Sequence, residues 1–128
     1  MQTQIDDLLS QALKARTNAY MPYSNFAVGA ALECADGTIY TGCNIENASF
    51  GLTLCAERVA LLKAVSEGQR LLTRILVVAD EEPVMPCGAC LQVLLEFAPE
   101  ITVICAGLGG KVEMYRLQDL LPHSFSLK

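Results

Sequence analysis

The sequence has few basic residues, one histidine and no long apolar segment. Its 128 residues include nine Lys and Arg against fourteen Asp and Glu, which gives a formal net charge of −5. This balance argues against a nucleic-acid backbone or an anionic membrane surface as partner. No apolar run approaches the roughly 18 residues of a membrane-spanning helix, and the opening MQTQIDD lacks a signal-peptide pattern. We therefore expect a cytoplasmic protein with neither nucleic acid nor membrane as partner.

The chain also lacks internal repeats, low-complexity tracts and Gly/Ser-rich linkers, so we expect residues 1–128 to form a single domain. Hydrophobic residues make up 52% of the sequence, which excludes intrinsic disorder. A small domain leaves much of its apolar surface exposed, so this excess favours contacts between subunits.

Hydrophobic periodicity predicts helices and strands that alternate along the chain. A first helix, with Thr3 and Asp6 as a capping pair, is expected from apolar residues at helical spacing: Ile5, Leu8, Leu9, Ala12 and Leu13. Further helices are expected from residue 54 or 55 to 67, over 87–97, and just before Pro122. Strands are expected from the alternating residues 26–32, over 38–44, and over 75–79, 101–106 and 111–115.

The order of these elements predicts the sheet. Asp36-Gly37 is a hairpin signal, so the first two strands should be antiparallel. The strand, helix and strand of residues 75–106 form a βαβ unit, whose two strands should be parallel. We therefore expect an α/β fold with three layers, α/β/α, around a mixed sheet of about five strands.

Three cysteines and a glutamate carry the chemical signal. Cys55, Cys87 and Cys90 fall at the starts of expected helices, where free backbone N–H groups and the helix dipole favour thiolates. Cys87 and Cys90 face the same way on one helical turn. A third thiolate from Cys55 would leave the fourth position of Zn²⁺ for water, as in catalytic zinc sites. Glu57 is then close enough to act as general base.

The cysteine spacing leaves other interpretations open. A CxxC pair can also be redox-active, and Cys34, Cys43 or Cys105 could complete a structural four-cysteine site. Those three cysteines lie in expected strands, where free cysteine usually behaves as a small buried hydrophobe. From spacing alone, catalytic zinc is only slightly favoured over structural zinc, and the reaction is not specified.

Five motifs follow one another along nearly the whole chain. They are PYSNFAVGAA (22–31), GCNIENAS (42–49), TLCAER (53–58), PCGAC (86–90) and LLPHSF (120–125). This ordered set resembles the small homotetrameric cytidine deaminases, within the zinc-dependent nucleobase and nucleoside deaminases. The resemblance implies the cytidine deaminase-like fold, one Zn²⁺ per subunit, and a homotetramer with active sites shared between subunits. It also implies deamination of cytidine and deoxycytidine, with release of ammonia, in pyrimidine salvage.

The resemblance implies a role for each matching residue. Cys55, Cys87 and Cys90 correspond to the zinc ligands, and His123 is too near the C-terminus to replace one of them. Glu57 corresponds to the proton carrier, which protonates N3 of cytosine and then the exocyclic amine while activated water attacks C4. Arg58 corresponds to an arginine that hydrogen-bonds ligand sulfurs and offsets the −1 charge of Zn²⁺ with three thiolates.

The same resemblance implies the substrate contacts. Asn44 and Glu46 would hold the ribose hydroxyls, and the backbone N–H of Ala56 would bind the pyrimidine carbonyl. Phe26 would pack against the nucleoside, and Phe125 would reach a neighbouring subunit's active site.

Two positions depart from the family pattern. Leu91 stands where arginine is usual, so charge compensation around the thiolates rests more heavily on Arg58. Phe50 stands where tyrosine is common, which removes a hydroxyl that could contact the sugar.

Several rival functions stay open from the sequence. The closest is a deaminase of a modified cytosine nucleoside such as blasticidin S. A polynucleotide deaminase would need a basic groove, which this acidic chain does not offer. A noncatalytic zinc-stabilised module and a CxxC oxidoreductase are the alternatives from other classes of protein.

Overall fold

One mixed sheet of five strands forms the centre of the computed structural model, which describes the backbone of residues 2–127 and the side chains of residues 5–127. The strands are β1 (Gly29–Cys34), β2 (Ile39–Cys43), β3 (Leu72–Val78), β4 (Thr102–Ala106) and β5 (Val112–Arg116). Their order across the sheet is β2-β1-β3-β4-β5. Strands β3 and β4 are parallel, and the other neighbours are antiparallel. The predicted antiparallel hairpin and parallel βαβ pair are both confirmed.

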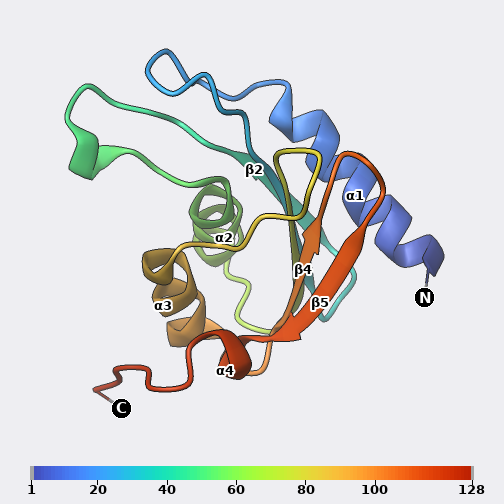
Figure 1. Ribbon diagram of the computed structural model, residues 1–128. Helices are drawn as coiled ribbons and strands as arrows, with labels where there is room; N and C mark the ends of the chain where they lie inside the picture. Colours follow the sequence, from blue (N-terminus) through green and yellow to red (C-terminus); the bar gives the residue numbers. More distant parts are fainter. Residues whose placement is uncertain (1, 128) are drawn as a thin grey trace.

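Helices cover both faces of this sheet (Figure 1). Helix α1 (Gln2–Arg16) lies on one face, and α2 (Ala56–Ser66) and α3 (Gly88–Phe97) lie on the other. A short α4 (Leu117–Leu120) follows β5, and a 3₁₀ turn, η1 (Phe50–Leu52), precedes α2. The predicted three-layer α/β/α arrangement is therefore confirmed. Within the described residues, no helix is both long and apolar enough to cross a membrane.

The core divides into two clusters because successive strand residues point to opposite faces. Along β3, Leu76 and Val78 pack with α1, whereas Ile75 and Val77 pack with α2 and α3. This strand is apolar over its whole buried length, as expected of a strand covered on both faces. Helices α2 and α3 thus pack against the same face of the sheet, which positions them relative to each other.

The element boundaries differ from the predicted ones at the start of the sheet. Strand β1 begins at Gly29, so Phe26 does not belong to a strand as the alternation predicted. Two features of the backbone explain why the strand begins later than predicted. Asn25 has a left-handed φ of 57°, and the Val28 N–H bonds the Asn44 side chain instead of a neighbouring strand.

Helix ends follow the predicted signals more closely. Gly68, with φ of 92°, follows α2 as expected of a residue that ends a helix. Helix α1 begins at Gln2, and the Thr3 side chain of the predicted capping pair lies outside the described side chains. The turn η1 was not predicted, because its residues lack helical periodicity.

Candidate active site

Three thiols converge at the starts of α2 and α3. Cys55 is the N-cap residue of α2 and Cys87 that of α3, while Cys90 lies in the first turn of α3. Their sulfur atoms all lie within 4.8 Å of one another. The Cys87 sulfur lies 3.5 Å from the Cys90 sulfur and accepts the Cys90 backbone N–H, also at 3.5 Å. The structure thus brings the three predicted ligands together at two helix N-termini, as the sequence predicted.

The surroundings of these thiols favour charge on Cys55. The hydrogen bond from Cys90 and the nearby Arg58 lower the pKa of Cys55 to about 5, against the opposing effect of burial. Cys90 is fully buried, and its hydrogen bond to Cys55 together with burial raises its pKa. The lowered pKa favours the thiolate form of Cys55, which is the form that binds a metal cation.

Arg58 lies beside this cluster. Its Nη2 donates to the Cys55 sulfur at 3.6 Å and to the Thr53 carbonyl at 3.5 Å. Its Nε is buried without a hydrogen-bond partner. The predicted contact between this guanidinium and a ligand sulfur is present, and it places a positive charge where three thiolates would accumulate negative charge.

Glu57 is a buried carboxylate beside the thiols. Its side chain comes from the first turn of α2, and the residue is 4% exposed. Burial, reinforced by the charge of Cys55, raises the pKa of Glu57 to about 7. Its Oε1 is buried with no hydrogen-bond partner. Since buried polar atoms are normally satisfied, this oxygen is the kind of group that a bound water or substrate completes.

Residues 44–46 form the wall next to the cluster. Ile45 exchanges two backbone hydrogen bonds of 2.9 Å with Leu54, so this segment lies directly beside Cys55. On its other side, Tyr20 N donates to Asn44 O at 3.0 Å and Glu46 N to Tyr20 O at 2.9 Å. Asn44 and Glu46 are both 8% exposed, and both side chains line the same pocket.

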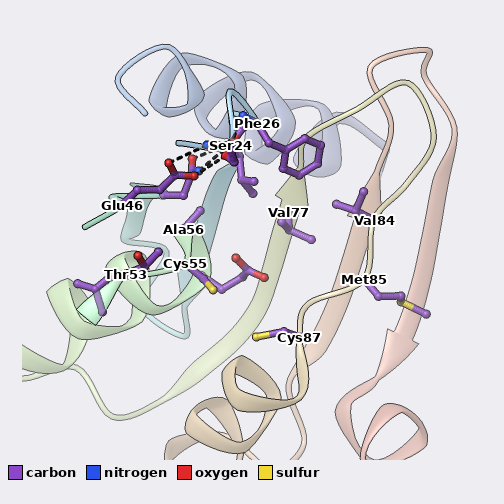
Figure 2. Close-up of a pocket in the computed structure, with 14 residues that line it drawn as sticks. Ser24, Phe26, Glu46, Thr53, Cys55, Ala56, Val77, Val84, Met85 and Cys87 are labelled. Carbon is purple, nitrogen blue, oxygen red and sulfur yellow. Dashed lines mark hydrogen bonds between the residues drawn. The ribbon is translucent and has the colours of Figure 1, made fainter. Parts of the chain in front are cut away.

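A pocket of about 280 Å³ opens over these groups. Fourteen residues line it: Ser24, Phe26, Val28, Asn44, Glu46, Thr53, Leu54, Cys55, Ala56, Glu57, Val77, Val84, Met85 and Cys87. Figure 2 shows Phe26 and Ser24 at one end of this pocket, Cys87 at the other, and Val84 and Met85 along one side. As the first residue of α2, Ala56 has a backbone N–H without an acceptor inside the helix.

Other predicted residues stay apart from the pocket of the same chain. Phe125 is 68% exposed, and its backbone pairs with the Gln92 side chain on α3. Phe50 is 80% exposed on η1, and Leu91, a residue of α3, is buried in the core. Within the described residues, none of Cys34, Cys43, Cys105 and His123 joins the thiol cluster.

Part of the pocket lining has no signal in the sequence. Val84 and Met85 precede the PCGAC motif and form one side of the pocket, although no chemical residue type marks them. Ser24 has no predicted role in the sequence, but its hydroxyl contacts Glu46. Its position within the first motif is the one signal that could have singled it out.

The cluster fits zinc in number and in type of ligand. Three thiolates are common zinc ligands, and three protein ligands leave a fourth tetrahedral position open, as in catalytic sites. Among the described residues, this is the one group of three or more potential metal-binding side chains. The unpartnered Glu57 oxygen beside it is consistent with a site that also receives water.

Comparison with known proteins gives consistent matches over almost the entire chain. A family model described as the cytidine and deoxycytidylate deaminase zinc-binding region matches residues 2–106. The chain is 51% identical to a cytidine deaminase of Sporosarcina psychrophila over 124 residues, 95% of this chain and 91% of that protein. It is 52% identical to a cytidine deaminase of Halalkalibacterium halodurans over 121 residues, 93% and 92% of the two chains.

A solved structure agrees in fold as well as in sequence. The crystal structure of cytidine deaminase from Burkholderia pseudomallei superimposes with a TM-score of 0.91 at 46% identity, covering 94% of this chain and 98% of that one. The strand order, the thiol cluster and these matches lead to one conclusion: the chain belongs to the zinc-binding cytidine and deoxycytidylate deaminase family.

Proposed function

We propose that this protein hydrolyses the exocyclic amine of cytidine and deoxycytidine, giving uridine and deoxyuridine with release of ammonia. The observation that carries the proposal is the buried Glu57 carboxylate, whose Oε1 has no hydrogen-bond partner, beside three convergent thiols in a pocket. The relatives named cytidine deaminase, at 51% and 52% identity, support this substrate over a modified cytosine nucleoside.

The thiols would hold one Zn²⁺ per subunit, through Cys55, Cys87 and Cys90. When bound in this way, zinc lowers the pKa of a coordinated water to about 7 and so supplies a nucleophile at neutral pH. Arg58 would offset part of the negative charge that the three thiolates bring to the site.

Glu57 would move the protons. Its pKa of about 7 lets it accept a proton from water and release one at neutral pH, because catalysis is most effective when the pKa lies near the working pH. It would deliver one proton to N3 of the cytosine ring and another to the exocyclic nitrogen, which leaves as ammonia. Burial in the pocket disfavours the charged form, so this carboxyl group stays protonated up to a higher pH than an exposed one.

The remaining pocket residues would orient the nucleoside. The Ala56 N–H would bind the pyrimidine carbonyl, and Phe26 would pack against the ligand. Asn44 already donates to Phe26 O at 2.8 Å and accepts from Val28 N at 2.9 Å. One amide hydrogen and one oxygen lone pair remain on Asn44, so it can still bind a sugar hydroxyl beside Glu46.

A homotetramer with shared active sites would bring Phe125 to a neighbouring pocket. Phe125 is largely exposed and held away from the pocket of its own chain, which supports a role in trans. Phe50 and Leu52, which are 80% and 67% exposed, offer further apolar area for subunit contacts. The reduced thiols that zinc binding needs suit the cytoplasm, where the reaction would serve pyrimidine salvage.

Replacement of Glu57 tests the proposed function. We expect the zinc-loaded Glu57→Gln variant to keep its zinc and to lose at least about 100-fold in cytidine turnover, since general acid–base catalysis contributes at least that much. The readouts are uridine formation by chromatography and zinc content by atomic absorption. Glu100→Gln, on an exposed loop, is the matched control. Unchanged turnover in Glu57→Gln would reject the proposal.

A further inference from the structure

Hydrogen bonds of Ser24 link two segments that line the pocket, the one with Glu46 and the one with Phe26. The Ser24 hydroxyl donates to Glu46 Oε2 and accepts the Phe26 backbone N–H at 3.0 Å. Figure 2 shows Ser24 between the Glu46 carboxylate and the Phe26 side chain. A single hydroxyl therefore contacts both the Glu46 carboxylate and the backbone of Phe26, whose aromatic ring lines the pocket.

The Glu46 carboxylate is held almost entirely by this turn. Its Oε1 accepts the Tyr23 N–H at 3.0 Å and the Ser24 N–H at 3.2 Å, and the Ser24 hydroxyl binds its other oxygen. A carboxylate has about four acceptor positions. Three of them are used, so one position on Oε2 remains for a ligand, and its direction is set by the Ser24 hydroxyl.

The same hydroxyl fixes the backbone of Phe26 together with Asn44. The Phe26 N–H is bonded by Ser24 and its carbonyl by Asn44 Nδ2 at 2.8 Å. Both backbone groups of Phe26 are thus bonded by side chains that line the pocket, in a segment outside the sheet. The Ser24 hydroxyl and backbone N–H, with that of Tyr23, also lower the pKa of Glu46 and keep it ionised.

We propose that Ser24 is a positioning residue of the nucleoside site, which aims the free acceptor of Glu46 at a sugar hydroxyl and fixes Phe26 against the ligand. This inference rests on the proposed function, since it concerns the substrate of that pocket. Ser24 acts through Glu46 and through the Phe26 backbone, so its removal weakens substrate binding and leaves the chemistry at Glu57 largely intact.

Kinetics of Ser24 variants test this role. We expect Ser24→Ala to raise KM for cytidine about tenfold, as for loss of a hydrogen bond to a charged group, with kcat within about threefold. Ser24→Thr, which keeps the hydroxyl, should restore KM, and Ser10→Ala on the exposed face of α1 should leave it unchanged. In a Glu46→Ala background, Ser24→Ala should raise KM by a smaller factor than in the unmodified chain, because only its contact with the Phe26 backbone remains.

A second readout does not depend on turnover. In the zinc-loaded protein, ¹³C NMR titration of the Glu46 carboxyl should give a higher pKa in Ser24→Ala than in the unmodified chain or in Ser24→Thr. An unchanged Glu46 pKa, or an equal rise in KM with and without Glu46, would overturn the role of Ser24. A shifted pKa in a protein that does not convert cytidine would reject the proposed function and leave the Ser24 contact standing.

Discussion

Two groups at the floor of the pocket have pKa values that move in opposite directions. Burial raises the pKa of Glu57 to about 7, whereas the hydrogen bond from Cys90 and the charge of Arg58 lower that of Cys55 to about 5. A carboxyl group that can exchange protons near neutral pH therefore lies two residues from a thiol that favours its thiolate form. Pairs of titratable groups separated in this way are typical of sites that use acid–base chemistry.

Loss of the Arg58 guanidinium should weaken zinc binding. Its Nη2 lies 3.6 Å from the Cys55 sulfur, and Leu91 offers no second cation on α3. We expect Arg58→Met to lower zinc affinity by about 10- to 100-fold, the usual effect of removing a partner of a metal ligand. Competition with a chromophoric chelator measures this change. Arg116→Met, which removes an exposed pair with Asp119, is the control, and equal zinc affinity in both variants would contradict the prediction.

At the scale of elements, periodicity and turn signals predicted most of the fold. The hairpin, the parallel pair of the βαβ unit and the helix starts at Cys55 and Cys87 are all confirmed. These features depend on local sequence, which explains why they could be predicted. The three-layer arrangement followed from the predicted order of helices and strands, and the apolar residues of β3 agree with it because a strand of this kind is covered on both faces.

Features set by side-chain contacts across the chain could not be predicted. Phe26 alternates with Val28 in sequence, but side chains of Asn44 and Glu46 hold its segment outside the sheet. Of the candidate site, the three thiols followed from spacing and helix position. The substrate-contact roles of Asn44, Glu46 and Phe125 followed from the family motifs, and they stay proposals.

Close contact between β2 and α2 makes Gly42 sensitive to substitution. A Cβ there would clash with the Ala56 carbonyl and lie 2.7 Å from Ala60 N, both in the backbone of α2. We expect Gly42→Ala to lower the free energy of unfolding by about 1–3 kcal/mol, the usual cost of overpacking, as measured by urea denaturation. Gly51→Ala, where a Cβ meets nothing within 4 Å, should change it by less than about 0.5 kcal/mol. Equal stability of the two variants would contradict the prediction.

The pairing of β1 with β3 should make stability depend on pH. Glu33 accepts two hydrogen bonds from Arg74, at 2.7 and 2.9 Å, and they lower the Glu33 pKa from its ordinary 4.5. A lowered pKa in the folded state stabilises the fold above the ordinary pKa, and this stabilisation is lost as pH falls through the folded pKa.

We therefore expect the unmodified chain to exceed Glu33→Gln in unfolding free energy by at most about 1 kcal/mol at pH 7, with a smaller difference below about pH 4. Urea denaturation at several pH values measures this difference, and acid release of zinc affects both proteins alike. A difference that is constant from pH 7 to pH 3 would show that the ion pair does not contribute as expected.

At the scale of the whole molecule, the proposed assembly places Phe125 in a neighbouring site. A chain with Glu57→Gln lacks its proton carrier but still offers Phe125, and a chain with Phe125→Ala has the reverse defect. Refolding the two variants together should form mixed tetramers in which some sites have both groups. We expect the mixture to exceed the mean kcat/KM of the separate variants by several-fold, whereas strict additivity would reject a role in trans.

The three thiols and Glu57 are proposed to serve the deamination of cytidine. The most direct measurement is the amount of ammonia and uridine released from cytidine by the purified, zinc-loaded, unmodified chain. We predict equal molar amounts of the two products, formed over many turnovers. Bound zinc at one ion per subunit with neither product formed would contradict the claim.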